Sequence, residues 1–443
     1  MHLFSSTINP SILPKIKQTI AYYIEKEEKY GFVLDSNAYA YSHALAAEDS
    51  NFMPTDCHEY EYTAGLGWYK GILIQNIHDY SPEKLQAIDY HHYLYFIFVN
   101  YEYKAITFPA CPTTLDTPLE FPLMAIFTPI ILIRIQGNTI DFCSPSLDSS
   151  ELEAYYDLLL QYGIPVVEPT QSIHLATGVT WEVYNEKFQC IQQHIQQGNV
   201  YELNYCIPFT ASSVCLSVAS TYVSLNSLTE APMAGFVKLD SHYILSGSPE
   251  RYICQKDTCV ISQPIKGTAR RCENDVQTVQ QLYHNNKERT ENIMITDMVR
   301  NDLSILATTN SVEVKELCGV YSFKTVHQLI STVQASIDTD THNWIDLLFT
   351  TFPMASMTGT PKQSALQIID SIELVSREAY SGTMGYIHQN KLDLNVLIRS
   401  IFYNQEKHYL SYSVGSAITA YTTAEEEYQE CLLKAEAMQK SLV

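Results

Sequence analysis

Basic residues are scarce in this sequence. The 443-residue chain has 27 lysines and arginines against 49 aspartates and glutamates, which gives a formal net charge of −22 at pH 7. Nucleic acids and anionic membrane surfaces are bound mainly through clusters of basic side chains, so this composition argues against both as partners. An anionic ligand would need a local cationic pocket, or a metal ion, within a surface that otherwise repels it.

Paired cysteines and long apolar runs are also missing. The eleven cysteines are scattered without Cys-x-x-Cys pairs or zinc-ligand spacing, which is typical of reduced thiols in the cytoplasm. The longest apolar run, residues 121–135, contains two prolines and predicts one or two buried strands instead of a membrane span. The first residues lack the apolar segment of a signal peptide. We therefore expect a soluble, cytoplasmic protein.

What the sequence does contain predicts a large folded unit. Apolar residues make up 46% of the chain, and its 32 tyrosines favour strand-rich structure. Strands and helices are mixed without regular βαβ alternation, which predicts an α+β fold of large, mostly antiparallel sheets packed together and covered by helices. The proline-containing stretch at 162–172 suggests a strand-rich N-terminal region, 1–170, packed on a catalytic domain, 171–443.

Several helices are predicted in the second part of the chain. A long helix is expected over 275–303, and another over 361–376, with a proline in its first turn. The last helix is predicted to begin at Thr423, where Glu426 would complete a capping box. These helices carry most of the charged residues that are candidates for a site.

The stretch QPIKGTARR, residues 263–271, places Lys266 at the end of a predicted strand, directly before Gly267. This lysine could be a solvated turn residue, an anchor for an anion, or a nucleophile whose pKa is lowered by burial. The glycine beside it would allow the backbone to approach a ligand closely. The stretch alone leaves the three interpretations open.

Two of the predicted helices carry glutamates at helical spacing. Glu288 and Glu291 lie three residues apart, so both can face one site. Glu427 and Glu430 lie on the last helix, with Lys434 four residues beyond the second of them. A solvated acidic face or a surface ion pair would explain either pattern. If one glutamate from each helix met across a cleft, the two would bind Mg²⁺ and leave coordination positions for a substrate oxygen.

Two segments rich in small residues are suited to anion binding. FPMASMTGTPK, residues 352–362, leads into a predicted helix N-terminus. YSVGSAITA, residues 412–420, is a strand whose small side chains let backbone N–H groups reach a ligand. Because Gly-Ser turns are common, neither segment identifies a ligand.

Taken in order, seven stretches resemble the chorismate-utilising enzymes. They are SPER, PIKGT, ERTENIMITDMVRNDL, FPMASMTGTPK, YSGTMGYI, IRS and EYQECLLKA. The resemblance covers about residues 180–440, and the first 170 residues match only loosely. It implies the fold of anthranilate synthase component I.

Within that family, the lysine of PIKGT resembles the aminodeoxychorismate synthases, because anthranilate synthases usually carry alanine there. The resemblance implies that Lys266 attacks C2 of chorismate while the C4 hydroxyl leaves. Ammonia then adds at C4 and expels the lysine, which gives 4-amino-4-deoxychorismate, a precursor of p-aminobenzoate and folate. Glu250 would be the acid or base beside the C4 substituent. The chemistry requires a neutral amine in a water-poor cavity.

The resemblance also implies a ligand set. Glu291 and Glu430 would bind Mg²⁺, and Glu288 and Glu427 would support them. Chorismate would be bound by Gly267, Thr268, Ser356, Tyr380, Arg399, Gly415, Ser416, Ala417 and Lys434. The forked, always charged guanidinium of the arginine suits a carboxylate better than a lysine would.

The sequence departs from the family pattern at several positions. Gln328 stands where relatives usually have a histidine, with His327 beside it, and Tyr421 stands where an aspartate is common. Ser416 and Ala417 replace glycines of a GGGI-type turn. These departures put full activity, substrate affinity or regiochemistry in question.

None of the cysteines lies in a Gly-x-Cys-x-Gly nucleophile turn, so the sequence shows no glutaminase. We expect ammonia to come from a separate glutamine amidotransferase subunit. The alternatives are anthranilate synthase component I, isochorismate synthase, a non-catalytic chorismate-binding subunit and, remotely, a Schiff-base enzyme that uses pyridoxal phosphate.

Overall fold

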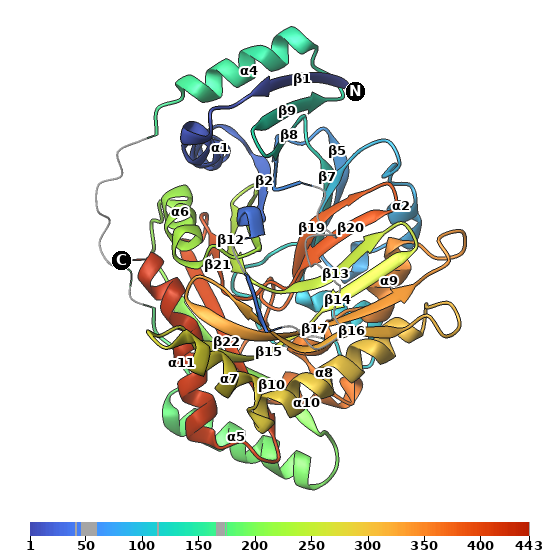
Figure 1. Ribbon diagram of the computed structural model, residues 1–443, viewed down its shortest axis with the longest axis vertical. Helices are drawn as coiled ribbons and strands as arrows, with labels where there is room; N and C mark the ends of the chain where they lie inside the picture. Colours follow the sequence, from blue (N-terminus) through green and yellow to red (C-terminus); the bar gives the residue numbers. More distant parts are fainter. Residues whose placement is uncertain (40–41, 46–59, 113–114, 165–172, 174, 443) are drawn as a thin grey trace.

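The computed structural model describes residues 1–39, 42–45, 60–112, 115–164, 173 and 175–442. Their strands form two large sheets with helices around them (Figure 1). The pairings within both sheets are antiparallel. The predicted α+β fold of antiparallel sheets covered by helices is therefore confirmed, whereas the predicted boundary at residue 170 lies outside the described residues.

The first sheet combines strands from both ends of the chain. In spatial order its eleven strands are β1 (His2–Thr7), β9 (Thr139–Ser144), β8 (Ile131–Gln136), β4 (Tyr62–Leu66), β2 (Tyr30–Asp35), β11 (Met233–Leu239), β12 (His242–Ser248), β21 (Ser400–Asn404), β22 (Tyr409–Thr419), β10 (Glu202–Ala211) and β18 (Gly359–Thr360).

The second sheet is assembled in the same mixed way. Its order is β3 (Ser42–Leu45), β16 (Glu313–Ser322), β17 (Val326–Ser336), β14 (Cys259–Gln263), β13 (Arg251–Lys256), β20 (Lys391–Asn395), β19 (Thr383–His388), β6 (Tyr95–Val99), β7 (Met124–Thr128) and β5 (Lys70–Ile74), while β15 (Ile265–Arg270) also pairs with β17.

The apolar residues form two main clusters, one on each face of the first sheet. Successive residues of a strand point to opposite faces, and β2 shows the consequence. Phe32 packs between the sheets with Phe96 and Phe127, whereas Val33 packs on the other face with Ile20 of α1 (Leu13–Glu27). Alternation in the sequence thus becomes a layered core.

Helices cover the outer faces of both sheets (Figure 1). The first sheet is packed by α1, α4 (Ser149–Gln161), α5 (Trp181–Gln196), α6 (Val218–Thr229) and α11 (Ala424–Ser441). The second is packed on β15, β16 and β17 by α7 (Asp275–Tyr283) and α8 (Asn286–Ser304). The remaining long helices, α9 (Trp344–Thr351) and α10 (Lys362–Ile372), lie close to α8 and β10 respectively.

Two helix predictions require correction. The single helix expected over 275–303 is two helices, because Asn285 leaves the helical conformation and its side chain accepts hydrogen bonds from the N–H groups of Lys287 and Glu288. The helix expected to reach residue 376 ends at Ile372. By contrast, Thr423 caps the last helix as predicted, and its hydroxyl accepts the N–H of Glu426. The Glu426 side chain accepts a hydrogen bond from the Thr423 hydroxyl and not, as the predicted capping box requires, from the Thr423 N–H.

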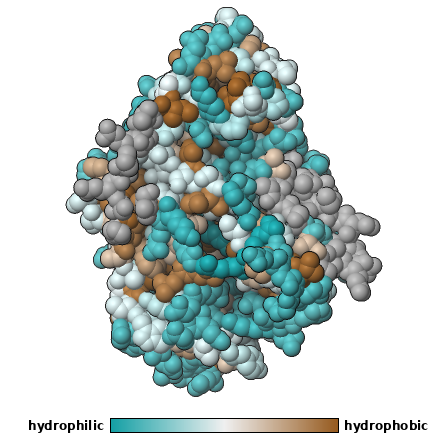
Figure 2. Space-filling view, turned by 60° about the vertical axis from the view of Figure 1, so that its left-hand side comes forward, coloured by the Kyte–Doolittle hydropathy of each residue, from teal (hydrophilic) through white to brown (hydrophobic). Residues whose placement is uncertain are grey.

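Hydrophilic side chains dominate the face shown in Figure 2, and apolar side chains form patches between them. Among the described residues, no helix has the length and apolar character needed to cross a membrane.

Candidate active site

One pocket collects most of the predicted site residues. Its walls come from β10, β15 and β22, from helices α8 and α11, and from the turn η6 (Ala355–Met357). The predicted residues that line it are Glu250, Lys266, Gly267, Thr268, Glu291, Ser356, Tyr380, Arg399, Gly415, Ala417, Glu430 and Lys434. Motifs from across the C-terminal part of the chain therefore meet at one place.

Three predicted residues do not line this pocket. Ser416 faces α5, where its hydroxyl lies 3.1 Å from the Tyr184 hydroxyl, because its neighbours in β22 take the pocket-facing side of the strand. Glu427 is buried, and its Oε1 forms an ion pair with Lys287 Nζ at 2.8 Å. Glu288 lies against Gly267, outside the pocket wall.

Gly267 allows β15 to depart from regular pairing with β17 next to Lys266. The register with β17 shifts between Ile265 and Thr268, and the φ of Gly267 is +95°, which favours glycine. A Cβ at this position would lie 2.9 Å from Leu329 Cδ1. The glycine therefore serves the backbone conformation and the close packing of this turn.

Replacing Gly267 by alanine should lower the free energy of unfolding by about 1–3 kcal/mol, because it adds crowding to an unfavourable φ. Urea titration would measure the loss. Gly137→Ala is the matched control, because Gly137 has a φ of +53° but no atom within 4 Å of its Cβ position. If the control lost as much stability as the Gly267 variant, the contact with Leu329 would contribute nothing to the loss at Gly267.

Lys266 makes one ion pair in this pocket. Its Nζ lies 3.1 Å from Oε1 of Glu202, at the start of β10, and the exposed fractions of the two side chains are 11% and 2%. Burial alone would lower the pKa of Lys266, but Glu202, Glu291 and Glu250 raise it above its ordinary value. The expectation of an amine held neutral by burial is therefore wrong for the resting pocket, in which Lys266 is charged.

Glu250 has the properties of an acid near neutral pH. It follows β12 and is buried. Burial raises the pKa of Glu250 to about 7, although Ser356, Lys266, the Ile265 backbone and Arg399 each lower it. At neutral pH this group can therefore both donate and accept a proton.

Arg399 provides an unpaired cation in the same pocket. Its backbone φ is +50°, an uncommon conformation for a residue other than glycine and one that clusters at functional sites. Burial lowers the pKa of Arg399 to about 10, and Glu250 opposes this shift. No residue of the described chain accepts a hydrogen bond from the guanidinium, so its donors are available to a carboxylate.

One glutamate of α8, Glu291, and one of α11, Glu430, line the pocket. Burial raises the pKa of Glu291 to about 8, while Lys266 lowers it. The Oε1 of Glu291 is buried and has no hydrogen-bond partner in the described chain. Glu430 is held by Lys434, whose Nζ also donates 2.9 Å to the Gly415 carbonyl. One orphaned carboxylate oxygen and a second carboxylate in the same pocket fit a divalent cation that takes its other ligands from water and substrate.

The structure does not contain a complete set of metal ligands. Across residues 1–442, apart from the gaps named above, no three acidic, histidine or cysteine side chains are gathered into a metal centre. A cation at Glu291 and Glu430 would therefore take its other ligands from water and substrate.

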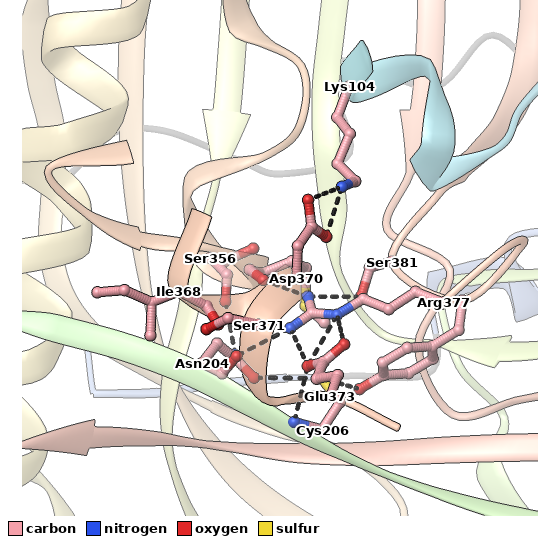
Figure 3. A network of polar contacts seen from close by, with 12 residues as sticks. Lys104, Asn204, Cys206, Ser356, Ile368, Asp370, Ser371, Glu373, Arg377 and Ser381 are labelled. Atoms are coloured by element: carbon pink, nitrogen blue, oxygen red, sulfur yellow. Dashed lines mark hydrogen bonds and ion pairs between the residues drawn. The ribbon is translucent and has the colours of Figure 1, made fainter. Parts of the chain in front are cut away.

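A buried polar network includes Asn204 and Ser356, two residues of the pocket wall (Figure 3). Arg377 is held by Glu373 and donates hydrogen bonds to the carbonyls of Asn204 (2.9 Å) and Met357 (2.6 Å). The Asn204 side chain in turn donates to the Ser356 carbonyl at 3.0 Å. Because Asn204 and Ser356 both line the pocket, this clamp ties β10 to the turn η6 and limits movement of the wall.

A family model for chorismate-binding enzymes matches residues 48–440. The chain belongs to the chorismate-binding enzyme family. The match begins well before residue 170 and so includes much of the strand-rich N-terminal region.

Curated relatives in the chorismate-binding family cover most of this chain. Aminodeoxychorismate synthase component 1 of Escherichia coli is 32% identical over 341 residues, which are 76% of this chain and 74% of the relative. The protein of the same name from Salmonella typhimurium is 38% identical over 330 residues, which are 73% and 71% of the two chains.

Solved structures of other chorismate-binding enzymes share the fold. The menaquinone-specific isochorismate synthase of Escherichia coli has a TM-score of 0.72 at 14% identity. The superposition covers 100% of this chain and 94% of the synthase chain. Anthranilate synthase component I of Streptococcus pneumoniae has a TM-score of 0.69 at 19% identity, with 99% and 92% covered. At these identities the likeness concerns the fold alone.

Gln328 stands where the family pattern usually has a histidine, and it lies in the pocket. Its Nε2 donates 3.4 Å to the Thr268 hydroxyl, and its Oε1 is buried without a hydrogen-bond partner in the described chain. His327 cannot replace the missing histidine, because it is engaged by Ser322 and Asp275. Adjacent residues of β17 face opposite ways.

Two residues of the site were missed in the sequence: Asn204, which lines the pocket, and Glu202, which forms the ion pair with Lys266. Glu202 and Asn204 alternate with Leu203 and Tyr205 along β10, and these apolar side chains belong to the core beneath the helices. In a half-buried strand, polar residues at alternate positions share a face. This pattern could have indicated that both residues lie on the pocket side.

Proposed function

We propose that this chain is an aminodeoxychorismate synthase component 1, which converts chorismate and ammonia to 4-amino-4-deoxychorismate. The observation that carries the proposal is Lys266, which lies in a buried pocket with Glu250, Arg399 and the glutamates Glu291 and Glu430. Curated relatives of that name support it. The product would serve the synthesis of p-aminobenzoate and folate.

Arg399 and Lys434 are the cations available to the two carboxylates of chorismate. The guanidinium of Arg399 has a free planar donor edge, which suits bidentate binding. Thr268, Ser356 and the backbone of β22 provide further polar groups on the same wall. In a buried pocket of an acidic protein, these groups would hold the dianion with its ring beside Lys266.

Lys266 would act as the nucleophile at C2, and its neutral amine would form the N–C bond while the C4 hydroxyl departs. Glu250 would give that hydroxyl its proton, so that water leaves. Ammonia then bonds to C4, the C2–N bond breaks, and the lysine is released. Glu250 can accept the surplus proton from the incoming amine, because its pKa of about 7 suits both directions.

Mg²⁺ forms the second part of the proposal. Glu291 and Glu430 would hold the ion, with Glu288 and Glu427 behind them. When bound, the ion would offset the negative charge of the substrate carboxylate. The described residues leave most of the coordination to water and substrate, which is usual for Mg²⁺.

Free Mg²⁺ at ten times its dissociation constant should stabilise the protein by about 1.4 kcal/mol, which a thermal melt would register. Glu291→Gln should remove most of this stabilisation because it neutralises the orphaned carboxylate. Glu313→Gln is the control, because Glu313 is exposed at the start of β16. An undiminished shift in the Glu291 variant would exclude this glutamate as a ligand.

Ammonia would come from a separate glutamine amidotransferase subunit, with this chain as the large subunit of a heterodimer. A cytoplasmic location is part of the same proposal. It is supported by cysteines of the described chain such as Cys111, Cys206 and Cys318, which are buried free thiols.

The product of the reaction tests the proposal. The purified chain is incubated with chorismate, Mg²⁺ and ammonium, and the products are separated and identified. We expect 4-amino-4-deoxychorismate without pyruvate. Anthranilate together with pyruvate would instead identify an anthranilate synthase, and isochorismate would identify an isochorismate synthase. Chorismate that is bound but not converted would identify a binding protein.

A further inference from the structure

Glu202 is the acidic group in closest contact with Lys266. Its Oε1 lies 3.1 Å from the lysine Nζ, and its side chain is 2% exposed. Its Oε2 is buried and has no hydrogen-bond partner in the described chain. Leaving a carboxylate oxygen buried without a donor is costly, so its presence beside a reactive amine calls for a function.

The other charged groups around Lys266 act on it from further away. Glu291 on α8, Glu250 after β12 and Glu430 on α11 face the same pocket, as does Lys434. No ion pair joins any of them to Lys266 among the described residues, whereas Glu202 makes one. Together the acidic groups raise the pKa of Lys266, so the resting amine carries a third proton and has no free electron pair. The covalent mechanism therefore lacks a step that removes this proton.

We propose that Glu202 is a catalytic base that takes one proton from Lys266 before each attack on the substrate and returns it afterwards. This inference rests on the proposed function, in which Lys266 is the nucleophile. It adds a second buried carboxylate to that mechanism. Glu202 acts on the lysine, whereas Glu250 acts on the C4 substituent of chorismate.

The proton balance closes over one turnover. The Lys266 ammonium passes a proton to Glu202, which becomes neutral, and the amine forms its bond to C2 while C4 loses its hydroxyl as water with a proton from Glu250. Ammonia bonds to C4, the C2–N bond breaks, and the lysine leaves as a neutral amine. Glu250 takes the surplus proton of the new C4 amine, and Glu202 returns its proton to Lys266.

The position of Glu202 separates these two roles. Glu250 must be protonated when the hydroxyl leaves, so it cannot also accept the lysine proton at that moment. Glu291 is the proposed metal ligand, so a bound cation would occupy its carboxylate and leave it unable to take the lysine proton. Glu202 has a spare, buried oxygen and needs no exchange with solvent. An internal transfer of this kind makes the supply of neutral amine independent of pH around neutrality.

The test is the rate at which the full chain forms a covalent adduct with chorismate in the absence of ammonia, followed by rapid quenching and mass spectrometry. Wild type, Glu202→Gln and Glu202→Asp are compared between about pH 6 and pH 9, a range that spans the pKa of histidine and approaches that of lysine. The ratio of variant to wild-type rates is used, because the contribution of Glu250 is common to both and cancels. Thermal melts confirm that the variants are folded.

At the acidic end, Glu202→Gln should form the adduct at least about tenfold more slowly, with the ratio rising up to about tenfold per pH unit as solvent removes the proton instead. Glu202→Asp should recover part of the rate without this slope. A ratio near one throughout, or a loss that is the same at every pH, would overturn the proposal, because it would leave Glu202 with no more than a positioning role. If wild type forms no adduct, the lysine mechanism itself fails, and this result is distinct from the other outcomes.

Discussion

Lys266→Ala should lower the rate of amination by at least about a thousandfold, because removing a nucleophile eliminates the covalent route. The structure gives this expectation a physical basis: the Nζ lies in a buried pocket, paired to Glu202 and surrounded by the groups that would bind the substrate. Product formation from chorismate and ammonium, measured with and without the substitution, checks the prediction.

Lys266→Arg is the matched variant for this experiment. Arginine keeps the positive charge beside Glu202 but cannot supply a neutral nitrogen at accessible pH. It should therefore retain chorismate binding better than the alanine variant, yet amination should be equally lost. Amination by either variant at a rate near that of wild type would remove the lysine from the covalent step.

Glu250→Gln should lower the rate of adduct formation by about 10²–10⁴-fold, the usual contribution of a positioned proton donor. In the wild-type protein the pKa of Glu250 is raised to about 7, so the acid form prevails below that pH and is lost above it. The rate should accordingly fall as the pH rises through 7. The glutamine variant should be slow and should lack this decline.

Stability provides a control for the Glu250 variant. A carboxyl whose folded pKa is raised contributes stability below its unfolded pKa and loses it as the pH rises through the folded value. Glutamine is neutral at every pH, so the variant should be at least as stable as wild type above pH 7. A slow variant that also melts early would indicate damage to the fold. If its pH decline persisted, another group would be the acid.

The chemistry of this site could be predicted from the sequence more completely than its geometry. Lys266, Glu291 and Glu430 lie in ordered motifs, and the structure brings all three to one pocket. The resemblance of these motifs to the family gave the reason to expect this. Helical spacing alone did not, because Glu288 and Glu427 lie three residues from Glu291 and Glu430 but do not line the pocket. Fold class followed from the irregular order of strands and helices.

What the sequence could not provide depends on contacts between distant segments. Burial was expected to lower the pKa of Lys266, but Glu202, far away in the chain, reverses the shift. The break between α7 and α8 at Asn285 was also missed, because the apolar spacing continues on both sides and only the local hydrogen bonds of the asparagine reveal it. Ser416 was assigned to the pocket although strand alternation turns its side chain to α5.

Each sheet contains strands from distant parts of the chain, and this has a consequence for folding during synthesis. In the first sheet, β2 is synthesised early and pairs with β11. The N-terminal strands are joined to β22 only through β11, β12 and β21. The nascent chain therefore has to wait for its last hundred or so residues before the open edges are covered, and such distant pairings form slowly. Until then, exposed strand edges invite association with other chains. Chaperone occupancy on the ribosome should be correspondingly long.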